Sequence, residues 1–206
     1  MTVYQPLVSL ARCLAAAAAL AFVAPALAAE PDDGPVLLVA KPALRDRLYG
    51  ATILIVRPIG RDRHIGFIVN RPTPVTLGKL FPDHGPSQKV VDPVYLGGPV
   101  NMEVLFALVQ QRDSPGRSAV QLTPDLYLAS ERDLVDQIIE TASENARFYA
   151  GLVIWAPGEL RVEIERGFWY VDDPDASLVL RKSTRGMWEE LVKRLESRPR
   201  GLRTSL

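Results

Sequence analysis

Short apolar runs separated by polar, Pro- and Gly-rich connections dominate this chain. The first three in its main part read VLLVA, ILIVR and HIGFIVN, and they cover residues 36–40, 53–57 and 64–70. Runs of this length that are rich in β-branched residues predict strands covered on both faces. The polar segment PIGRDRH joins the second run to the third and predicts a hairpin connection.

Four later segments also have strand character: VYLGGPV, VLFALVQ, LYLA and ARFYAGLVIW, which cover residues 94–100, 104–110, 126–129 and 146–155. The stretches PDHGPSQ and RDSPGRS between them are typical of loops. TLGKLF predicts one short helical turn with Thr76 near its start. Strands therefore follow one another, with helices placed irregularly among them.

The first longer helix is predicted to begin at Ser130, with Asp133 three residues later as in a capping box. One of its faces is apolar. The residues of that face are Leu134, Val135, Ile138, Ile139 and Ala142.

Two further helices follow the strand at 146–155. Pro157 is suited to the first position of one, and Glu159 then lies in its first turn, where the helix dipole favours an acid. The other begins near Ser183, ends at Pro199 and Gly201, and leaves residues 197–206 as a frayed tail. Its apolar positions follow an i, i+3, i+4, i+7 pattern at Trp188, Leu191, Val192 and Leu195. Together these elements predict one α+β domain on a mixed sheet over residues 29–206.

The first 28 residues have the layout of a secretory signal peptide. Arg12 precedes the apolar run CLAAAAALAFVAPAL, and the small residues Ala26 and Ala28 define a cleavage site near Ala28. The alternative is an uncleaved membrane anchor, but the run is shorter than the roughly 20 residues of a span and Pro25 interrupts it. We therefore expect a periplasmic or secreted protein with no stable membrane span after cleavage. A cytoplasmic location is the alternative if this segment is not a signal.

The composition argues against thiol-based sites and against nucleic-acid binding. The only cysteine, Cys13, lies inside the predicted signal, so the mature chain has no thiol for a disulfide, a zinc–thiolate site or a nucleophile. The 24 basic residues balance 24 acidic ones. Because the chain has no net positive field to attract a polyanion, we expect no nucleic-acid partner.

Asn70-Arg71-Pro72 ends the third predicted strand and has two interpretations. In the structural one, Pro72 keeps Arg71 extended and cannot donate to a ladder, so that pairing stops. Asn70 then satisfies a freed backbone group, and Arg71 pairs with Glu159 or Glu163. In the functional one, Arg71 offers its guanidinium to an anionic ligand or partner.

Gly97-Gly98-Pro99 resembles a phosphate loop only superficially, because no Walker lysine and no GxGxxG pattern accompany it. A tight turn that requires positive φ is the expected role.

Glu159 and Glu163 lie four apart on one face of the predicted helix, with Arg166 beside Glu163. Two neighbouring carboxylates can perform acid–base chemistry or bind a hard cation, but a first-turn acid also simply stabilises a helix. The two histidines, His64 and His84, fall in no ligand pattern, and no serine lies in a GxSxG elbow. We therefore expect no metal site, no cofactor and no assigned catalytic residue.

Four aromatic residues surround the same helix: Trp155, Phe168, Trp169 and Tyr170. Core packing is one reading of this cluster. The other is an aromatic-lined groove for a peptide or glycan.

Four segments in order resemble the YqgE/AlgH family of small bacterial proteins: VLLVAKPALRDRLYGATILIV, GFIVNRPTPVTLGKLF, VYLGGPV and GLVIWAPGELRVEIERGFWY. The resemblance covers residues 34–196 and implies a mixed, partly split β-sheet curled into a pseudo-barrel with helices packed outside. It implies no assigned reaction, and one branch of the family has been called a transcriptional regulator. The chain departs from the family in its predicted signal peptide and in Gly158-Glu159-Leu160-Arg161, where the family has Gly-Gln-Leu-Glu.

These observations favour a non-enzymatic binding or adaptor domain of the bacterial envelope, with an envelope protein or a small anionic ligand as its partner. The candidate binding residues are Asn70, Arg71, Gly97, Gly98, Trp155, Glu159 and Glu163. One alternative is a hydrolase that uses Glu159 or Glu163 with a histidine. The other is a cytoplasmic transcriptional regulator, which export would rule out.

Overall fold

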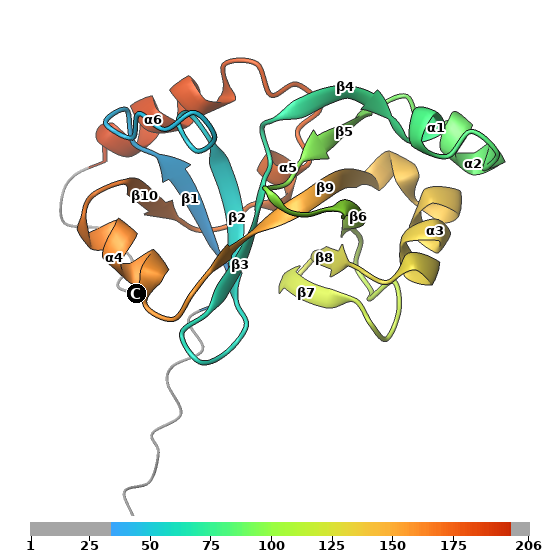
Figure 1. The fold of residues 1–206 in the computed structure, drawn as a ribbon, viewed down its shortest axis with the longest axis horizontal. Helices are drawn as coiled ribbons and strands as arrows, with labels where there is room; N and C mark the ends of the chain where they lie inside the picture. Colours follow the sequence, from blue (N-terminus) through green and yellow to red (C-terminus); the bar gives the residue numbers. More distant parts are fainter. Residues whose placement is uncertain (1–33, 199–206) are drawn as a thin grey trace, which may run out of the picture. The chain divides into compact units, whose positions relative to one another are not determined.

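The computed structural model describes residues 34–198, so the predicted signal peptide and the end of the predicted tail lie outside the described residues. Ten strands of this part form one connected sheet, in the order β10-β1-β2-β3-β9-β6-β8-β7, with β4 and β5 attached beside β9 (Figure 1). The strands are β1 (Val36–Ala40), β2 (Ile53–Pro58), β3 (His64–Ile68), β4 (Pro72–Thr76), β5 (Pro93–Leu96), β6 (Val100–Gln110), β7 (Val120–Thr123), β8 (Leu126–Ala129), β9 (Ala146–Trp155) and β10 (Trp169–Asp172). The helices are α1 (Leu77–Leu80), α2 (Gly85–Gln88), α3 (Arg132–Thr141), η1 (Ser143–Asn145), α4 (Glu159–Glu165), α5 (Ala176–Val179) and α6 (Met187–Glu196).

The long strand β9 belongs to both parts of a split sheet. Its C-terminal half pairs antiparallel with β3, which leads on to β2, β1 and β10. Its N-terminal half pairs antiparallel with β6 on one side and parallel with β5 on the other. The mixed, partly split and curled sheet of an α+β fold is thereby confirmed (Figure 1).

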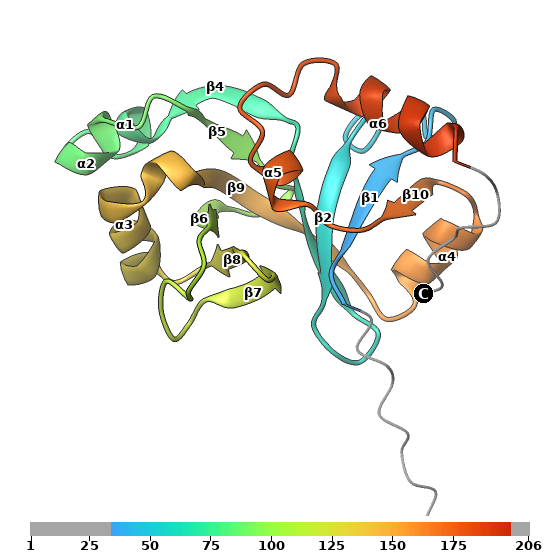
Figure 2. The same ribbon diagram turned by 180° about the vertical axis from the view of Figure 1, so that it is seen from behind.

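Alternate residues of the β1–β2 strands enter two different hydrophobic clusters, because side chains along a strand point to opposite faces. Leu37 and Val39 pack with Met187 and Leu191 of α6, which covers one face of β1 and β2 (Figure 2). Leu38 and Leu54 pack instead with Leu160 of α4 on the other face. Both faces are covered, as the continuous apolar runs predict.

The predicted apolar face of α3 packs on the other part of the sheet. Leu134, Val135, Ile138 and Ile139 are buried in a third cluster with residues of β6, β8 and β9. The helix begins two residues later than predicted, at Arg132, and its N-cap Glu131 makes no side-chain capping hydrogen bond. The predicted capping box at Ser130 is therefore wrong.

Other element boundaries also differ from the sequence expectation. Pro72 does not end pairing but begins β4, which pairs with β5 instead of with the neighbours of β3. A short helix, α2, occupies the predicted loop at 82–88, and β7 lies in a stretch for which we predicted no strand. Helix α4 begins at Glu159 with Gly158 as N-cap, so that Pro157 precedes the helix, and α6 begins only at Met187.

Gly97 and Gly98 pack backbone to backbone against β9. A Cβ on Gly97 would lie 2.2 Å from the Gly151 carbonyl oxygen, and one on Gly98 would lie 2.2 Å from the Leu152 carbonyl carbon. The predicted positive φ is wrong for this pair and occurs at Gly151 instead, with φ +71°. Close approach of two backbones, rather than turn conformation, requires these glycines.

Arg147 is a charged residue of β9 with only 6% of its surface exposed. Its guanidinium donates to the carbonyls of Val69, Val179 and Arg181 and lies 4.3 Å from the centre of the Tyr95 ring. Val179 is the last residue of α5, where a cation is favoured, and Arg181 follows just after its C-cap Leu180. Arg147 therefore fastens α5 to the sheet.

No helix within residues 34–198 is long and apolar enough to cross a bilayer.

We expect Gly98→Ala to lower the free energy of unfolding by about 3 kcal/mol, because the new methyl group meets β9 backbone that cannot rotate away. Gly85→Ala is the matched control, since nothing lies within 4 Å of a Cβ at that position. Urea unfolding with a constant m-value measures both changes. Equal midpoints for the two variants would contradict the role assigned to this contact.

Candidate functional site

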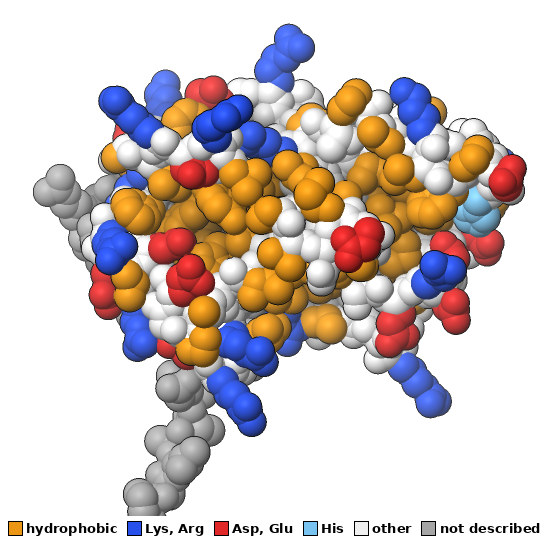
Figure 3. Space-filling view, viewed as in Figure 1, with side chains coloured by type: hydrophobic (Ala, Val, Ile, Leu, Met, Phe, Trp, Pro, Cys, Tyr) orange, Lys and Arg blue, Asp and Glu red, His pale blue; other side chains and the backbone are white. Residues whose placement is uncertain are grey.

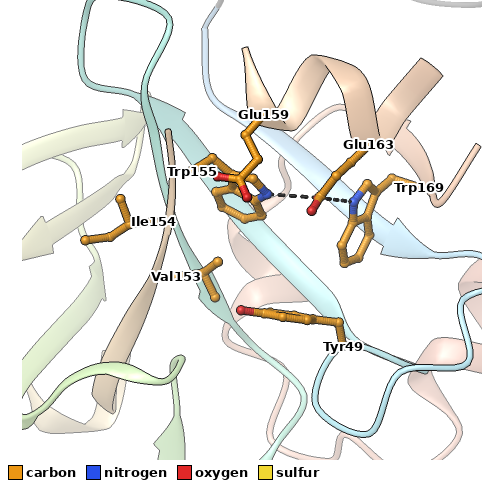
Figure 4. A pocket seen from close by; sticks show the side chains of 7 residues that line it. All are labelled: Tyr49, Val153, Ile154, Trp155, Glu159, Glu163 and Trp169. Atoms are coloured by element: carbon orange, nitrogen blue, oxygen red, sulfur yellow. Dashed lines mark hydrogen bonds between the residues drawn. The ribbon is translucent and has the colours of Figure 1, made fainter. Parts of the chain in front are cut away.

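A pocket opens between the end of β9, helix α4, the start of β10 and the loop before β2 (Figure 4). Its volume is about 100 Å³, well above what one ordered water needs. Seven residues line it: Tyr49, Val153, Ile154, Trp155, Glu159, Glu163 and Trp169. Three of them are candidates that the sequence identified, namely Trp155, Glu159 and Glu163.

The Glu163 carboxylate is held between two indoles. Its Oε2 atom accepts hydrogen bonds from Trp155 Nε1 at 2.9 Å and from Trp169 Nε1 at 2.8 Å (Figure 4). Both indoles are buried, at 3% and 4% exposure. The two donors offset part of the cost of placing a carboxylate against apolar rings and fix its position.

Sequence and local structure explain this arrangement. Trp155 is the last residue of β9, and the short turn Ala156-Pro157-Gly158 leads directly into α4. Leu160 and Ile164 of α4 pack into the same cluster as the two tryptophans. Glu163 therefore faces the pocket from the helix, while Trp169 returns beside it at the start of β10.

Glu159 has a different local role. Its Oε2 atom accepts a hydrogen bond from the Ala156 backbone N–H at 2.8 Å, so the side chain closes the turn that opens α4. The first-turn acid is thus placed as predicted. The side chain is exposed and borders the pocket, but both indole N–H groups donate to Glu163 instead.

Tyr49 reaches the pocket from the loop before β2, with its ring and hydroxyl turned toward Val153 (Figure 4). Burial raises the pKa of its hydroxyl above the ordinary value of 10.0, and the charge of Glu163 adds to this shift. Asp46 and Glu159 contribute in the same direction. Sequence reasoning missed Tyr49, because no periodicity marks a loop residue. Its position in one of the four family segments was the available signal.

Asn70 and Arg71 do not line the pocket but hold the loop that carries Tyr49. The Asn70 amide accepts from Ile53 N and donates to the Ala51 carbonyl, both at 2.9 Å. Arg71 Nη2 donates to the Gly50 carbonyl at 2.8 Å. The prediction that Asn70 hydrogen-bonds backbone groups is confirmed. None of the ion pairs within residues 34–198 includes Arg71, so its expected pairing with an acid of α4 is wrong.

Gly97 and Gly98 line neither this pocket nor the hollow beside it. Gly97 lies against Tyr149 and Gly151 of β9, and Gly98 lies against Leu152 and against Val153, which lines the pocket. Their contribution to the site is therefore to position the strand behind it.

A shallower hollow continues from the pocket along the outer side of α4. Its volume is about 390 Å³, and it shares Glu159 and Glu163 with the pocket. Phe168 and Val162 supply apolar surface, and Arg161 and Arg166 supply positive charge. The predicted aromatic cluster is thus divided, since Phe168 faces this hollow while Tyr170 packs on the other face of the sheet with the α6 cluster.

The histidines lie in different places. His84 Nδ1 is 2.7 Å from Ser87 Oγ, and His84 Nε2 is 3.7 Å from Glu140 Oε1. This Ser–His–Glu sequence of contacts lies between α2 and α3, and Ser87 is fully buried, so its hydroxyl is out of reach of a substrate. His64 lies opposite Trp155 in the β3–β9 ladder. Residues 34–198 contain no group of three or more His, Cys, Asp or Glu side chains placed to hold a metal ion.

Asn70→Ala tests whether the Asn70 side chain holds the loop that carries Tyr49. We expect it to lower the free energy of unfolding by about 2 kcal/mol, because it leaves the N–H of the buried Ile53 without its acceptor. Asn145→Ala, at an exposed position, is the control and should change stability by less than about 0.5 kcal/mol. Urea denaturation gives both values. If Asn70→Ala left the stability unchanged, Asn70 would not stabilise this loop.

Glu163→Gln should lower the pKa of Tyr49 toward 10 without reaching it, because one cause of the increase is removed while burial remains. The phenol then loses its proton at lower pH than in the unmodified protein. Ring carbon chemical shifts of labelled tyrosine, followed by NMR against pH, measure the change. Glu165→Gln on the same helix is the control, and equal Tyr49 titrations in both variants would show that Glu163 does not act on this hydroxyl.

The chain is similar to proteins of one bacterial family. A UPF0301 protein of Anaeromyxobacter dehalogenans strain 2CP-1 is 30% identical over 189 residues, covering 83% of this chain and 94% of that protein. A UPF0301 protein of Bacteroides thetaiotaomicron is 25% identical over 171 residues, covering 82% of this chain and 85% of the relative.

Two solved structures share the fold. The crystal structure of a protein from Corynebacterium diphtheriae has a TM-score of 0.67 at 24% identity, over 84% of this chain and 90% of the other. The solution structure of the AlgH protein from Pseudomonas aeruginosa has a TM-score of 0.64 at 22% identity, over 79% of this chain and 88% of the other. The AlgH-like family profile matches residues 37–200, and the chain therefore belongs to the AlgH-like family.

Proposed function

We propose that this chain is an exported, non-enzymatic binding domain of the bacterial envelope, and that it contacts a protein partner through the pocket between β9 and α4. The observation that carries the proposal is the Glu163 carboxylate, fixed by two buried indoles in a pocket open to solvent. A charged group held rigidly among aromatic side chains is a common feature of binding sites, where a few polar groups orient a ligand within an apolar lining.

The rim of the pocket supports a protein partner. Ile154 and Val162 are large apolar side chains that remain 46% and 40% exposed beside the pocket and the adjoining hollow. On the face shown in Figure 3, hydrophobic side chains form a broad area with acidic side chains beside it. Apolar surface bordered by charge is typical of surfaces that bind other proteins.

The pocket favours binding over hydrolysis. Glu163 is occupied by two indole donors, and Glu159 by a backbone N–H. Ser87, which contacts His84, is buried at the α2–α3 side of the sheet. The small anionic ligand expected from the sequence depended on Arg71, whose guanidinium donates to the Gly50 carbonyl and does not line the pocket.

Export rests on the first 28 residues, with their basic start, apolar run and small residues before Ala29. A transcriptional regulator in the cytoplasm remains the alternative from a different class. It requires that the full-length chain stay in the cytoplasm.

A photo-cross-linking residue at Val162 tests location and binding together. In cells of the host, we expect it to give one discrete cross-linked species in the periplasmic fraction, whose intact mass fits a chain starting near Ala29. The same residue at Val91, which is 84% exposed but far from the pocket in the connection between α2 and β5, is the control and should give none.

Two results would refute the proposal. A full-length chain in the cytoplasmic fraction would remove export and favour the regulator. Identical cross-links from Val162 and Val91, or none from either, would show that the pocket does not contact a protein partner.

A further inference from the structure

We infer that the β9–α4 pocket binds a cationic side chain of the partner, the guanidinium of an arginine or the ammonium of a lysine, with Glu163 as its counter-ion. This inference rests on the proposed function for the source of the cation, a protein, but its chemistry is argued from the pocket alone.

The unused oxygen of Glu163 gives the first reason. Both indole hydrogen bonds go to Oε2, and Oε1 accepts none from any residue in the described range 34–198. This oxygen is not among the buried atoms that lack a partner, so a ligand can reach it from solvent, and a charged donor gives the strongest bond. The indoles fix the carboxylate, so little ordering entropy is lost when a cation binds.

The charges around the pocket give the second reason. Glu159 lines the pocket beside Glu163, and the charges of Glu159 and Asp46 act on Tyr49 in the same direction as that of Glu163. The nearest basic residue on the first turn of α4, Arg161, is bound to Asp62 at 2.9 Å. Arg166 lines the neighbouring hollow but forms no ion pair within residues 34–198. None of the ion pairs within residues 34–198 includes Glu163, so its charge is open to an external cation.

The aromatic wall gives the third reason. Tyr49 is half-buried and faces the pocket with its ring and its hydroxyl. Because it remains protonated at neutral pH, it presents a neutral ring face and an acceptor oxygen rather than a competing charge. Cations are attracted to such ring faces, and arginine in particular combines ring stacking with a carboxylate hydrogen bond.

Other ligand classes fit less well. An anion would meet two carboxylates. An apolar side chain would leave Glu163 Oε1 covered without a donor, which is costly. A calcium ion takes six to eight oxygen ligands, and one oxygen of Glu163 is already committed to two N–H donors.

The indole N–H signals of the chain make a direct test. The sequence has three tryptophans. Two line the pocket, and the third, Trp188, donates to the Ala40 carbonyl beneath α6. Four blocked amino-acid amides serve as probes in ¹⁵N–¹H NMR titrations: N-acetyl-arginine amide, its neutral isostere N-acetyl-citrulline amide, N-acetyl-lysine amide and N-acetyl-glutamate amide.

We expect arginine amide or lysine amide to move the Trp155 and Trp169 signals and to leave Trp188 unmoved. Citrulline amide should bind at least about tenfold more weakly, because it lacks the charge. Raising the salt concentration should weaken binding of the cation. Glu163→Gln, which keeps an amide oxygen for an indole, should weaken it about tenfold, whereas Glu165→Gln should leave it within about twofold.

The comparison of arginine with citrulline on the unmodified protein needs no variant, so it decides the matter even if Glu163→Gln does not fold. Equal shifts with citrulline, larger shifts with glutamate, or movement of Trp188 alone would overturn the inference. If Val162 still gives its specific cross-link in that case, the binding function stands and only the ligand class fails. If the cation binds but the cross-link is absent, the pocket chemistry stands and the envelope partner fails.

Discussion

The backbone of Gly97 bridges the two parts of the sheet, and the rest of the structure depends on this contact. Its N–H donates to the Ala150 carbonyl of β9 at 2.9 Å, and its carbonyl accepts from Ile68 N at the end of β3 at 2.8 Å. Because β9 exchanges β5 for β3 as its neighbour at this point, the chain must pass between the strands without a side chain. The direction of the last residues of β9, and hence the place of Trp155, follows from this crossing.

Strand β9 is also anchored at its two ends by polar groups inside apolar surroundings. At its start, the buried guanidinium of Arg147 is satisfied by three carbonyls and the Tyr95 ring, with no carboxylate among these contacts. At its end, the Trp155 indole donates to Glu163. Buried polar groups without partners are costly, so each anchor specifies one position for a segment that is distant in sequence. The first fixes α5, and the second fixes α4 and the pocket.

Local patterns in the sequence predicted most of the strands and the apolar faces of the helices, because burial on both sides of a strand or on one side of a helix leaves a periodic trace. The strand at 146–155 and the short turn after Thr76 lie where predicted. What failed was non-local. Three features depend on segments that only folding brings together. Pro72 starts a strand with a different partner, Gly97 and Gly98 allow two backbones to meet, and Arg147 reaches α5. For the site, the sequence found Trp155, Glu159 and Glu163 from their spacing around one helix, but it had no means to place Tyr49 beside them.

The difference between Glu159 and Glu163 gives the altered family stretch at 158–161 a physical meaning. Glu159 bonds the turn before the helix, and Arg161 bonds Asp62 in the β2–β3 hairpin, where Gly158 N also donates to the Asp62 carbonyl at 3.2 Å. The Arg161 ion pair is largely exposed and contributes little stability by itself. These residues therefore attach the start of α4 to the hairpin, one turn away from the oxygen that the indoles hold. This chain has Glu159 where the family has Gln, and Arg161 where the family has Glu. These differences change how the helix is attached, while the carboxylate that contacts the indoles belongs to Glu163. A difference at 159 therefore changes the negative charge at the edge of the pocket, while the carboxylate that the two indoles hold is unaffected.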